Sequence, residues 1–256
     1  MLREIIEVAK KAGILLKNYF GLLDGEDIQR KKEGHFVTKA DKESEEFIVK
    51  ELVKKFPGVG ICSEERELIP GKGTFFVDPL DGTHNFIHKI SYFCVSIAYV
   101  EGSEIKIGVI YAPIFKELFY AEKGKGAFFN GRRIEHSKEK EISRALISIS
   151  IPSSAYNRRE EIFNFLKELI VQVNSLRMFG SAALQLADTA RGKIDGNLGF
   201  SLSPWDVSAG VLLVREAGGL VTNEKGGNEI SDGNIISGTP YIQKFLLDFI
   251  KNKVNK

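Results

Sequence analysis

Two aspartates lie three residues apart where a strand-like segment ends, a spacing that suits metal and phosphate chemistry. In the run Phe76-Val77-Asp78-Pro79-Leu80-Asp81-Gly82-Thr83, Pro79 is expected to stop the hydrogen-bonded ladder. Carboxylates and backbone carbonyls held on a sharp turn are ligands that Mg²⁺ prefers. Gly82 and Thr83 offer backbone N–H groups at the start of a short helical turn, where phosphate can bind. The structural alternative is an Asx turn in which Asp81 caps a helix.

Further acidic residues stand where predicted strands end or predicted helices begin. Glu64 and Glu65 follow an apolar strand over residues 59–62, Asp41 opens a helix, and Asp206 lies at another helix start. Taken singly, the glutamates fit a solvated face and the two aspartates fit plain helix caps. Taken together, they predict a group of carboxylates of the kind that a phosphoryl-transfer site with several metal ions requires.

The first half of the chain must position most of these residues. Apolar residues at helical spacing predict a helix over 2–20 that ends near Gly21, and a second helix runs from about 41 to 56. Residues 22–36 are charged, so they are expected to form a loop or mobile hairpin, with Lys31 and Lys32 on a candidate lid. Asn130-Gly131 predicts a hairpin turn. Strands are expected at 59–62, 74–78, 93–100, 105–112 and 117–121.

In the second half, predicted strands and helices alternate. This pattern indicates a mixture of α+β and α/β structure. We expect residues 1–256 to form one catalytic unit, with halves at 1–140 and 141–256 as sub-lobes. Strands are expected at 145–150, 174–178, 194–198, 220–222 and 234–236, and helices at 158–171, 181–190, 207–217 and 241–250.

Composition describes an ordinary globular protein. The 256 residues carry 36 basic and 34 acidic side chains, a net charge of +2, which argues against nucleic-acid binding as the main task. Cys62 and Cys94 lie far apart and show neither metal-site nor disulfide spacing, so we expect buried thiols in a reducing compartment. No apolar run approaches the roughly 20 residues that cross a bilayer. We therefore expect a cytoplasmic protein with no membrane partner.

Several motifs together resemble the inositol monophosphatase family of Mg²⁺-dependent, lithium-sensitive phosphatases. The resemblance covers nearly the whole chain in the expected order. Its motifs are residues 77–83 with Asn85-Phe86, Gly124-Lys125-Gly126-Ala127 with Asn130-Gly131, Gly180-Ser181-Ala182-Ala183, and Trp205-Asp206 with Ala209-Gly210 and residues 216–219.

This resemblance implies a role for each candidate residue. Asp41 and Thr83 would orient the attacking water, with Glu65 as an auxiliary residue. The implied fold is the layered α-β-α-β-α sandwich of the sugar phosphatases, and family members are commonly homodimers. The implied ligands of two to three Mg²⁺ ions are Glu64, Asp78, Asp81, Asp206 and the carbonyl of Leu80. The implied substrate contacts are Gly82, Thr83, Ser181, Ala182 and Asp206.

The leaving group is the part of the substrate that the motifs leave open. The animal inositol enzymes present a glutamate before the Trp-Asp motif, whereas residues 196–204 contain no carboxylate. The main hypothesis is hydrolysis of inositol 1-phosphate. Alternatives are a dual inositol monophosphatase and fructose-1,6-bisphosphatase, a nucleotide 3′-phosphatase, or a regulatory protein associated with the transcription machinery.

A second phosphate on the substrate would need a cation. The candidate cations are Arg158, Arg159, Arg177 and Arg191, and their alternative role is solvated surface. Asp195 either contacts sugar hydroxyls or ends a strand. No histidine is assigned a catalytic role.

Overall fold

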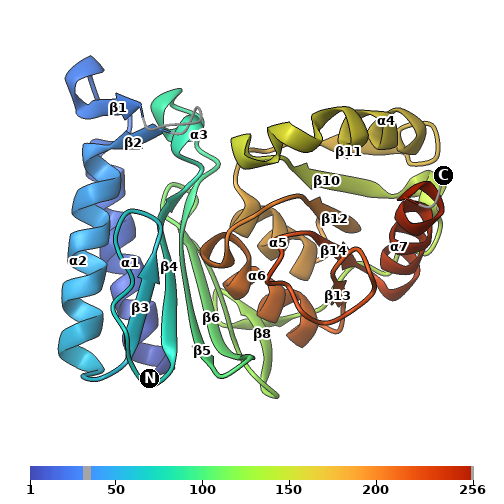
Figure 1. The fold of residues 1–256 in the computed structure, drawn as a ribbon. Helices are drawn as coiled ribbons and strands as arrows, with labels where there is room; N and C mark the ends of the chain where they lie inside the picture. Colours follow the sequence, from blue (N-terminus) through green and yellow to red (C-terminus); the bar gives the residue numbers. More distant parts are fainter. Residues whose placement is uncertain (31–35, 255–256) are drawn as a thin grey trace.

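The structure, a computed structural model, describes residues 1–30 and 36–254, so Lys31 and Lys32 of the expected lid lie outside the described residues. Two β-sheets and three pairs of helices alternate in five layers (Figure 1). This arrangement confirms the layered α-β-α-β-α fold. None of the described helices is long and apolar enough to span a bilayer.

The first sheet has seven strands in the order β3-β4-β5-β6-β7-β8-β9, with β3 and β4 parallel and all other neighbours antiparallel. Helices α1 (Leu2–Tyr19) and α2 (Lys39–Lys55) cover its outer face. Its strands are β3 (Gly60–Ser63), β4 (Thr74–Asp81), β5 (Cys94–Glu101), β6 (Glu104–Ala112), β7 (Glu117–Glu122), β8 (Gly126–Phe129) and β9 (Arg132–Ile134).

The second sheet has five strands in the order β11-β10-β12-β14-β13. Helices α5 (Ala182–Ala190) and α6 (Pro204–Glu216) form the layer between the two sheets, and α4 (Arg159–Leu169) and α7 (Pro240–Val254) lie on the far side (Figure 1). Its strands are β10 (Leu146–Ser150), β11 (Ser175–Arg177), β12 (Gly196–Gly199), β13 (Leu220–Thr222) and β14 (Ile235–Gly238).

Short elements complete the described chain. A two-stranded hairpin, β1 (Ile28–Arg30) with β2 (Phe36–Thr38), lies in the segment expected to be a loop or hairpin. Helix α3 (Thr83–Ile87) follows β4 directly. The remaining turns are the 3₁₀ helices η1 (Gly25–Asp27), η3 (Ile142–Arg144) and η4 (Ser153–Arg158).

Local sequence explains several element boundaries. Buried Ile5, Val8 and Leu16 form the inner stripe of α1, and Gly21 adopts φ +82° just after the helix, where a side chain is disfavoured. Asn130 and Gly131 have φ +46° and +83°, the two left-handed residues of a tight hairpin turn. Both turn predictions are confirmed.

Two predicted boundaries are wrong in ways that matter for the site. Pro79 does not end the strand, because the β4–β5 register shifts between Asp78 and Asp81 and pairing resumes at Asp81 with Cys94. Pro79 lies in a bulge, where the strand needs no hydrogen bond from a backbone N–H, so its missing N–H does not interrupt the ladder. Helix α6 begins at Pro204 rather than at 207, which puts Asp206 inside its first turn.

Candidate active site

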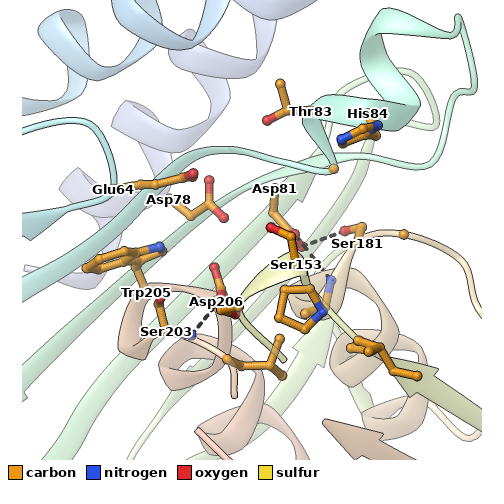
Figure 2. Close-up of a pocket in the computed structure, with 18 of the residues that line it drawn as sticks. Glu64, Asp78, Asp81, Thr83, His84, Ser153, Ser181, Ser203, Trp205 and Asp206 are labelled. Carbon is orange, nitrogen blue, oxygen red and sulfur yellow. Dashed lines mark hydrogen bonds between the residues drawn. The ribbon is translucent and has the colours of Figure 1, made fainter. Parts of the chain in front are cut away.

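A cleft of about 840 Å³ opens where β4 and β10 end and where α5 and α6 begin. Figure 2 shows Asp78, Asp81 and Asp206 pointing toward one another, with Glu64 reaching the same space from the end of β3. The predicted residues that line the cleft are Glu64, Asp78, Leu80, Asp81, Gly82, Thr83, Ser181, Ala182 and Asp206. Residues from both halves of the chain therefore meet in one place.

The bulge at Pro79 shapes the turn that carries two of these residues. The Leu80 N–H donates to Asp78 Oδ1 at 3.0 Å, so Asp78 does form the Asx turn that was the structural alternative. The Ser44 hydroxyl of α2 donates to the Pro79 carbonyl at 3.0 Å and fixes the turn from behind. The turn is thus anchored without using the second carboxylate oxygen of Asp78.

Asp81 caps a helix, although a different one from the helix expected. The Ser181 hydroxyl and the Ala183 N–H donate to Asp81 Oδ2 at 2.5 and 2.8 Å, and the Ala182 N–H donates to Oδ1 at 3.2 Å. Gly82, with φ +99°, is the N-cap of α3 instead. A carboxylate from the first sheet thereby satisfies the free amides at the start of α5.

The loop between β12 and α6 presents Asp206. The Ser203 N–H donates to Asp206 Oδ2 at 2.8 Å, one half of a capping box at the start of α6. Asp206 is half-buried, and its carboxylate points toward Asp78 and Asp81 (Figure 2). The capping role and the cleft-facing role therefore coexist in one side chain.

Asp41 and Thr83 form a hydrogen-bonded pair beside the carboxylates. The Thr83 hydroxyl lies 3.0 Å from Asp41 Oδ1 and 3.1 Å from the Leu80 carbonyl, so its one proton has two acceptors. The Thr38 N–H donates to Asp41 Oδ2 at 2.8 Å. Asp41, which is 1% exposed, is thus fixed by the cap of α2 while its other oxygen faces Thr83.

The carboxylates of the cleft repel one another electrostatically. Burial, followed by the charges of Glu64, Asp81 and Asp206, raises the pKa of Asp78 well above its ordinary value. Burial and the charge of Asp81 raise the pKa of Asp206 to about 7. Burial raises the pKa of Asp41 to about 6, although hydrogen bonds from Thr38 and Thr83 oppose the rise. Such a group favours the binding of positive charge.

The donor set consists of oxygen atoms, the ligand type that binds hard divalent cations. Within residues 1–30 and 36–254, no three Asp, Glu, His or Cys side chains are close enough together to enclose an ion. Mg²⁺ needs no such cage, because it keeps several waters and binds proteins through a few oxygen ligands. Carboxylates with raised pKa values beside the Leu80 carbonyl provide that kind of site.

Some predicted residues have partners that sequence reasoning missed. Ser181 and Ala182 line the cleft but already donate to Asp81, a contact across about 100 positions that no local pattern signals. Glu65, the predicted auxiliary residue, donates its N–H to the buried carboxylate of Glu45 at 3.1 Å. Glu45 follows Asp41 by one helical turn, which is the only sequence signal it gave.

The candidate cations for a second phosphate do not line the cleft. Arg158 pairs with Glu161 and Glu224, and Arg191 pairs with Glu117 and Asp188. Arg159 and Arg177 are exposed, and Arg177 donates to the Ser175 hydroxyl and the Leu176 carbonyl.

Asp195 has a structural role, because its carboxylate accepts hydrogen bonds from the Ser137 hydroxyl and the Leu146 N–H. It lies immediately before β12 rather than at the end of a strand, and it ties this segment to Ser137 and to the start of β10.

Comparisons with known proteins agree with this fold and identify the family. The model of the inositol monophosphatase family matches residues 1–253. The chain is 38% identical to the inositol-1-monophosphatase of Mesorhizobium japonicum, with 100% of this chain and 97% of the relative covered. It is 36% identical to the fructose-1,6-bisphosphatase/inositol-1-monophosphatase of Aquifex aeolicus (98% and 96% covered) and 35% identical to the Nus factor SuhB of Escherichia coli (100% and 97%). The crystal structure of the extragenic suppressor protein suhB from Bartonella henselae superposes with a TM-score of 0.91 at 40% identity, covering 97% of each chain.

Proposed function

Because the chain belongs to the inositol monophosphatase family, we propose that it hydrolyses inositol 1-phosphate with the help of two to three Mg²⁺ ions. The observation that carries this proposal is that Asp78, Asp81 and Asp206 meet at one cleft with Thr83, whose hydroxyl is hydrogen-bonded to Asp41 behind it. Glu64, Asp78, Asp81, Asp206 and the Leu80 carbonyl are the proposed metal ligands. When bound, Mg²⁺ supplies positive charge that lowers the repulsion between a phosphate dianion and its attacker.

Asp41 and Thr83 are suited to move a proton. The Thr83 hydroxyl donates toward Asp41 Oδ1, so its oxygen can accept a proton from an attacking water while its own proton passes to Asp41. A pKa of about 6 lets Asp41 stay ionised near neutral pH and still accept a proton readily.

The turn after β4 is suited to hold the phosphate. Gly82 and Thr83 begin α3, so their N–H groups are free of partners within that helix. The left-handed conformation of Gly82 directs this turn, and any other residue there would be strained. Fixed amides of this kind stabilise charge that develops on phosphate oxygens in the transition state.

The direct test is phosphate release from inositol 1-phosphate with Mg²⁺ and with EDTA. We expect turnover that EDTA abolishes, Mg²⁺ restores and lithium inhibits. A folded protein that releases phosphate from none of the monoesters tested would refute the proposal. Activity that persists in EDTA would refute the metal site alone.

The leaving-group end of the cleft is lined mainly by neutral side chains. No lysine or arginine is among the described residues that line the cleft. The buried Ser153 hydroxyl has no hydrogen-bond partner among the described residues. These features suit an uncharged alcohol better than a second phosphate.

A dual phosphatase is the second candidate, favoured by the name of the Aquifex aeolicus relative. Hydrolysis rates for inositol 1-phosphate and fructose 1,6-bisphosphate, measured side by side, distinguish the two. We expect the monoester to be preferred, and a comparable kcat/KM for the bisphosphate would favour the dual enzyme. A regulatory role is suggested by the name of the Nus factor relative. It predicts that an inactive Asp78→Asn variant still restores the growth of cells that lack this protein.

We further propose that the two halves work as one unit in a cytoplasmic homodimer. Family membership supports the dimer, as do four apolar side chains between 163 and 178 that are more than half exposed. These are Phe163 (63%), Ile170 (57%), Val171 (76%) and Met178 (61%). Sedimentation of the full chain at micromolar concentration tests this, and a monomer mass would refute it.

A further inference from the structure

The side chain of Asn85 joins two segments of the chain that lie behind the carboxylates. Its Nδ2 donates to the Tyr92 carbonyl and to the Phe179 carbonyl, each at 2.7 Å. The first acceptor belongs to the loop after α3, and the second lies two residues before Ser181. One amide therefore links the phosphate turn of the first half to the segment that leads into α5.

The backbones at this junction are in close contact. Gly180 has φ +80°, and a β-carbon on it would lie 3.0 Å from Asn85 Nδ2. A β-carbon on Gly82 would lie 3.1 Å from the Tyr92 carbonyl oxygen and 3.3 Å from that of Gly180. Both glycines have a positive φ and leave little space for a side chain, so the segments have little freedom to shift independently.

The consequence concerns Asp81. Residues 181–183, which follow the junction directly, supply the three hydrogen bonds that orient the Asp81 carboxylate. We propose that Asn85 is a positioning residue, which holds the start of α5 where it fixes Asp81 for metal binding. The inference rests on the proposed function, in which Asp81 is a ligand of Mg²⁺. Partners that orient a metal ligand typically contribute about 10- to 100-fold to metal affinity or activity.

Tyr92 provides a matched control at the same junction. Its ring stacks on that of Phe179 with centroids 5.0 Å apart, and its hydroxyl donates to Asp188 Oδ2 at 2.9 Å. Tyr92→Phe removes only the hydroxyl contact and keeps both the stacked ring and the carbonyl that Asn85 uses. It weakens the packing of α5 without releasing residues 179–181.

The experiment compares Asn85→Ala and Tyr92→Phe with the wild type. Mg²⁺ affinity is measured by calorimetry, and kcat and KM are measured on inositol 1-phosphate. We expect Asn85→Ala to weaken Mg²⁺ binding and to lower kcat, each by about 10-fold or more, with KM changed by less than about threefold. Tyr92→Phe is expected to lower the melting temperature and to leave Mg²⁺ affinity and kcat within twofold of the wild type.

Two results would overturn the inference. One is an Asn85→Ala protein whose Mg²⁺ affinity and kcat stay within twofold of the wild type, and the other is an equal loss in Tyr92→Phe. If Asn85→Ala does not fold, Gly180→Ala decides, because its β-carbon displaces the Asn85 amide and should weaken Mg²⁺ binding in the same way. A wild type that neither binds Mg²⁺ nor releases phosphate contradicts the proposed function instead.

Discussion

Asp206→Asn is expected to make the metal-free protein more stable while it destroys activity. The aspartate carries a pKa of about 7 because its charge is buried and faces Asp81. Asparagine removes that charge and keeps an oxygen that can accept the hydrogen bond from the Ser203 N–H. The variant therefore loses the unfavourable buried charge and keeps the hydrogen bond that caps α6.

The size of the gain follows from the pKa. A pKa of about 7 lies about three pH units above that of a free aspartate, which corresponds to about 4 kcal/mol against the charged folded state at pH 7.5. Asp206 is only half-buried, and its neighbours can take up a proton instead, so we expect about 2 kcal/mol. For a chain of 256 residues this raises the melting temperature by about 4–8 °C.

The pH dependence of stability follows from the pKa values of Asp206 in the unfolded and folded states. The unfolded carboxylate ionises near pH 4 and the folded one near pH 7, so the folded state loses stability as pH rises between them. The difference between variant and wild type should be small at pH 4 and complete above pH 7.

Thermal unfolding in EDTA and in excess Mg²⁺ provides the assay. Mg²⁺ should stabilise the wild type by about 2.7 kcal/mol at a hundred times its dissociation constant, and the variant by much less. Asp195→Asn is the matched control, because its carboxylate is hydrogen-bonded outside the cleft. That change should lower stability and leave the effect of Mg²⁺ intact. A variant no more stable than the wild type in EDTA at pH 7.5 would refute the reasoning.

Two further predictions concern Asp41 and Arg191. Because burial raises the pKa of Asp41 to about 6, log kcat should fall with unit slope as pH decreases below about 6, and a pH–rate profile flat from 5 to 7 would contradict its role as proton acceptor. Arg191 is 9% exposed and pairs with Glu117 and Asp188, so Arg191→Ala should cost about 3–5 kcal/mol by leaving buried charges unpaired. Calorimetry should show a lower melting temperature for Arg191→Ala. At temperatures where the variant is folded, its kcat should stay near the kcat of the wild type.

Local patterns in the sequence predicted most elements and the gathering of carboxylates that the structure shows at one cleft. The helix expected over residues 2–20 is α1, and the Asn130-Gly131 turn lies between β8 and β9. These features depend on neighbours a few residues apart, which periodicity and turn chemistry describe well. The same is true of Asp41, whose capping box with Thr38 is complete within four residues.

Contacts between distant segments could not be predicted in this way. The bulge at Pro79 depends on how β4 pairs with β5, which no pattern within β4 describes. Arg158 and Arg191 each have one partner three positions away and another about 70 positions away, and the distant partner could not be read from the sequence. Charge alone does not distinguish a substrate contact from an ion pair.

Asp81 should respond to substitution in the opposite way from Asp206, although both belong to the same group of carboxylates. Both oxygens of Asp81 accept hydrogen bonds from α5, and burial raises its pKa while those bonds oppose the rise. An asparagine there keeps one acceptor oxygen but directs its NH₂ group at an N–H group of α5, so at least one backbone N–H at the start of α5 loses its acceptor. Asp81→Asn should therefore lower the melting temperature in EDTA, where Asp206→Asn raises it. Equal shifts in the two variants would mean that repulsion, and not the capping of α5, determines the stability of this site.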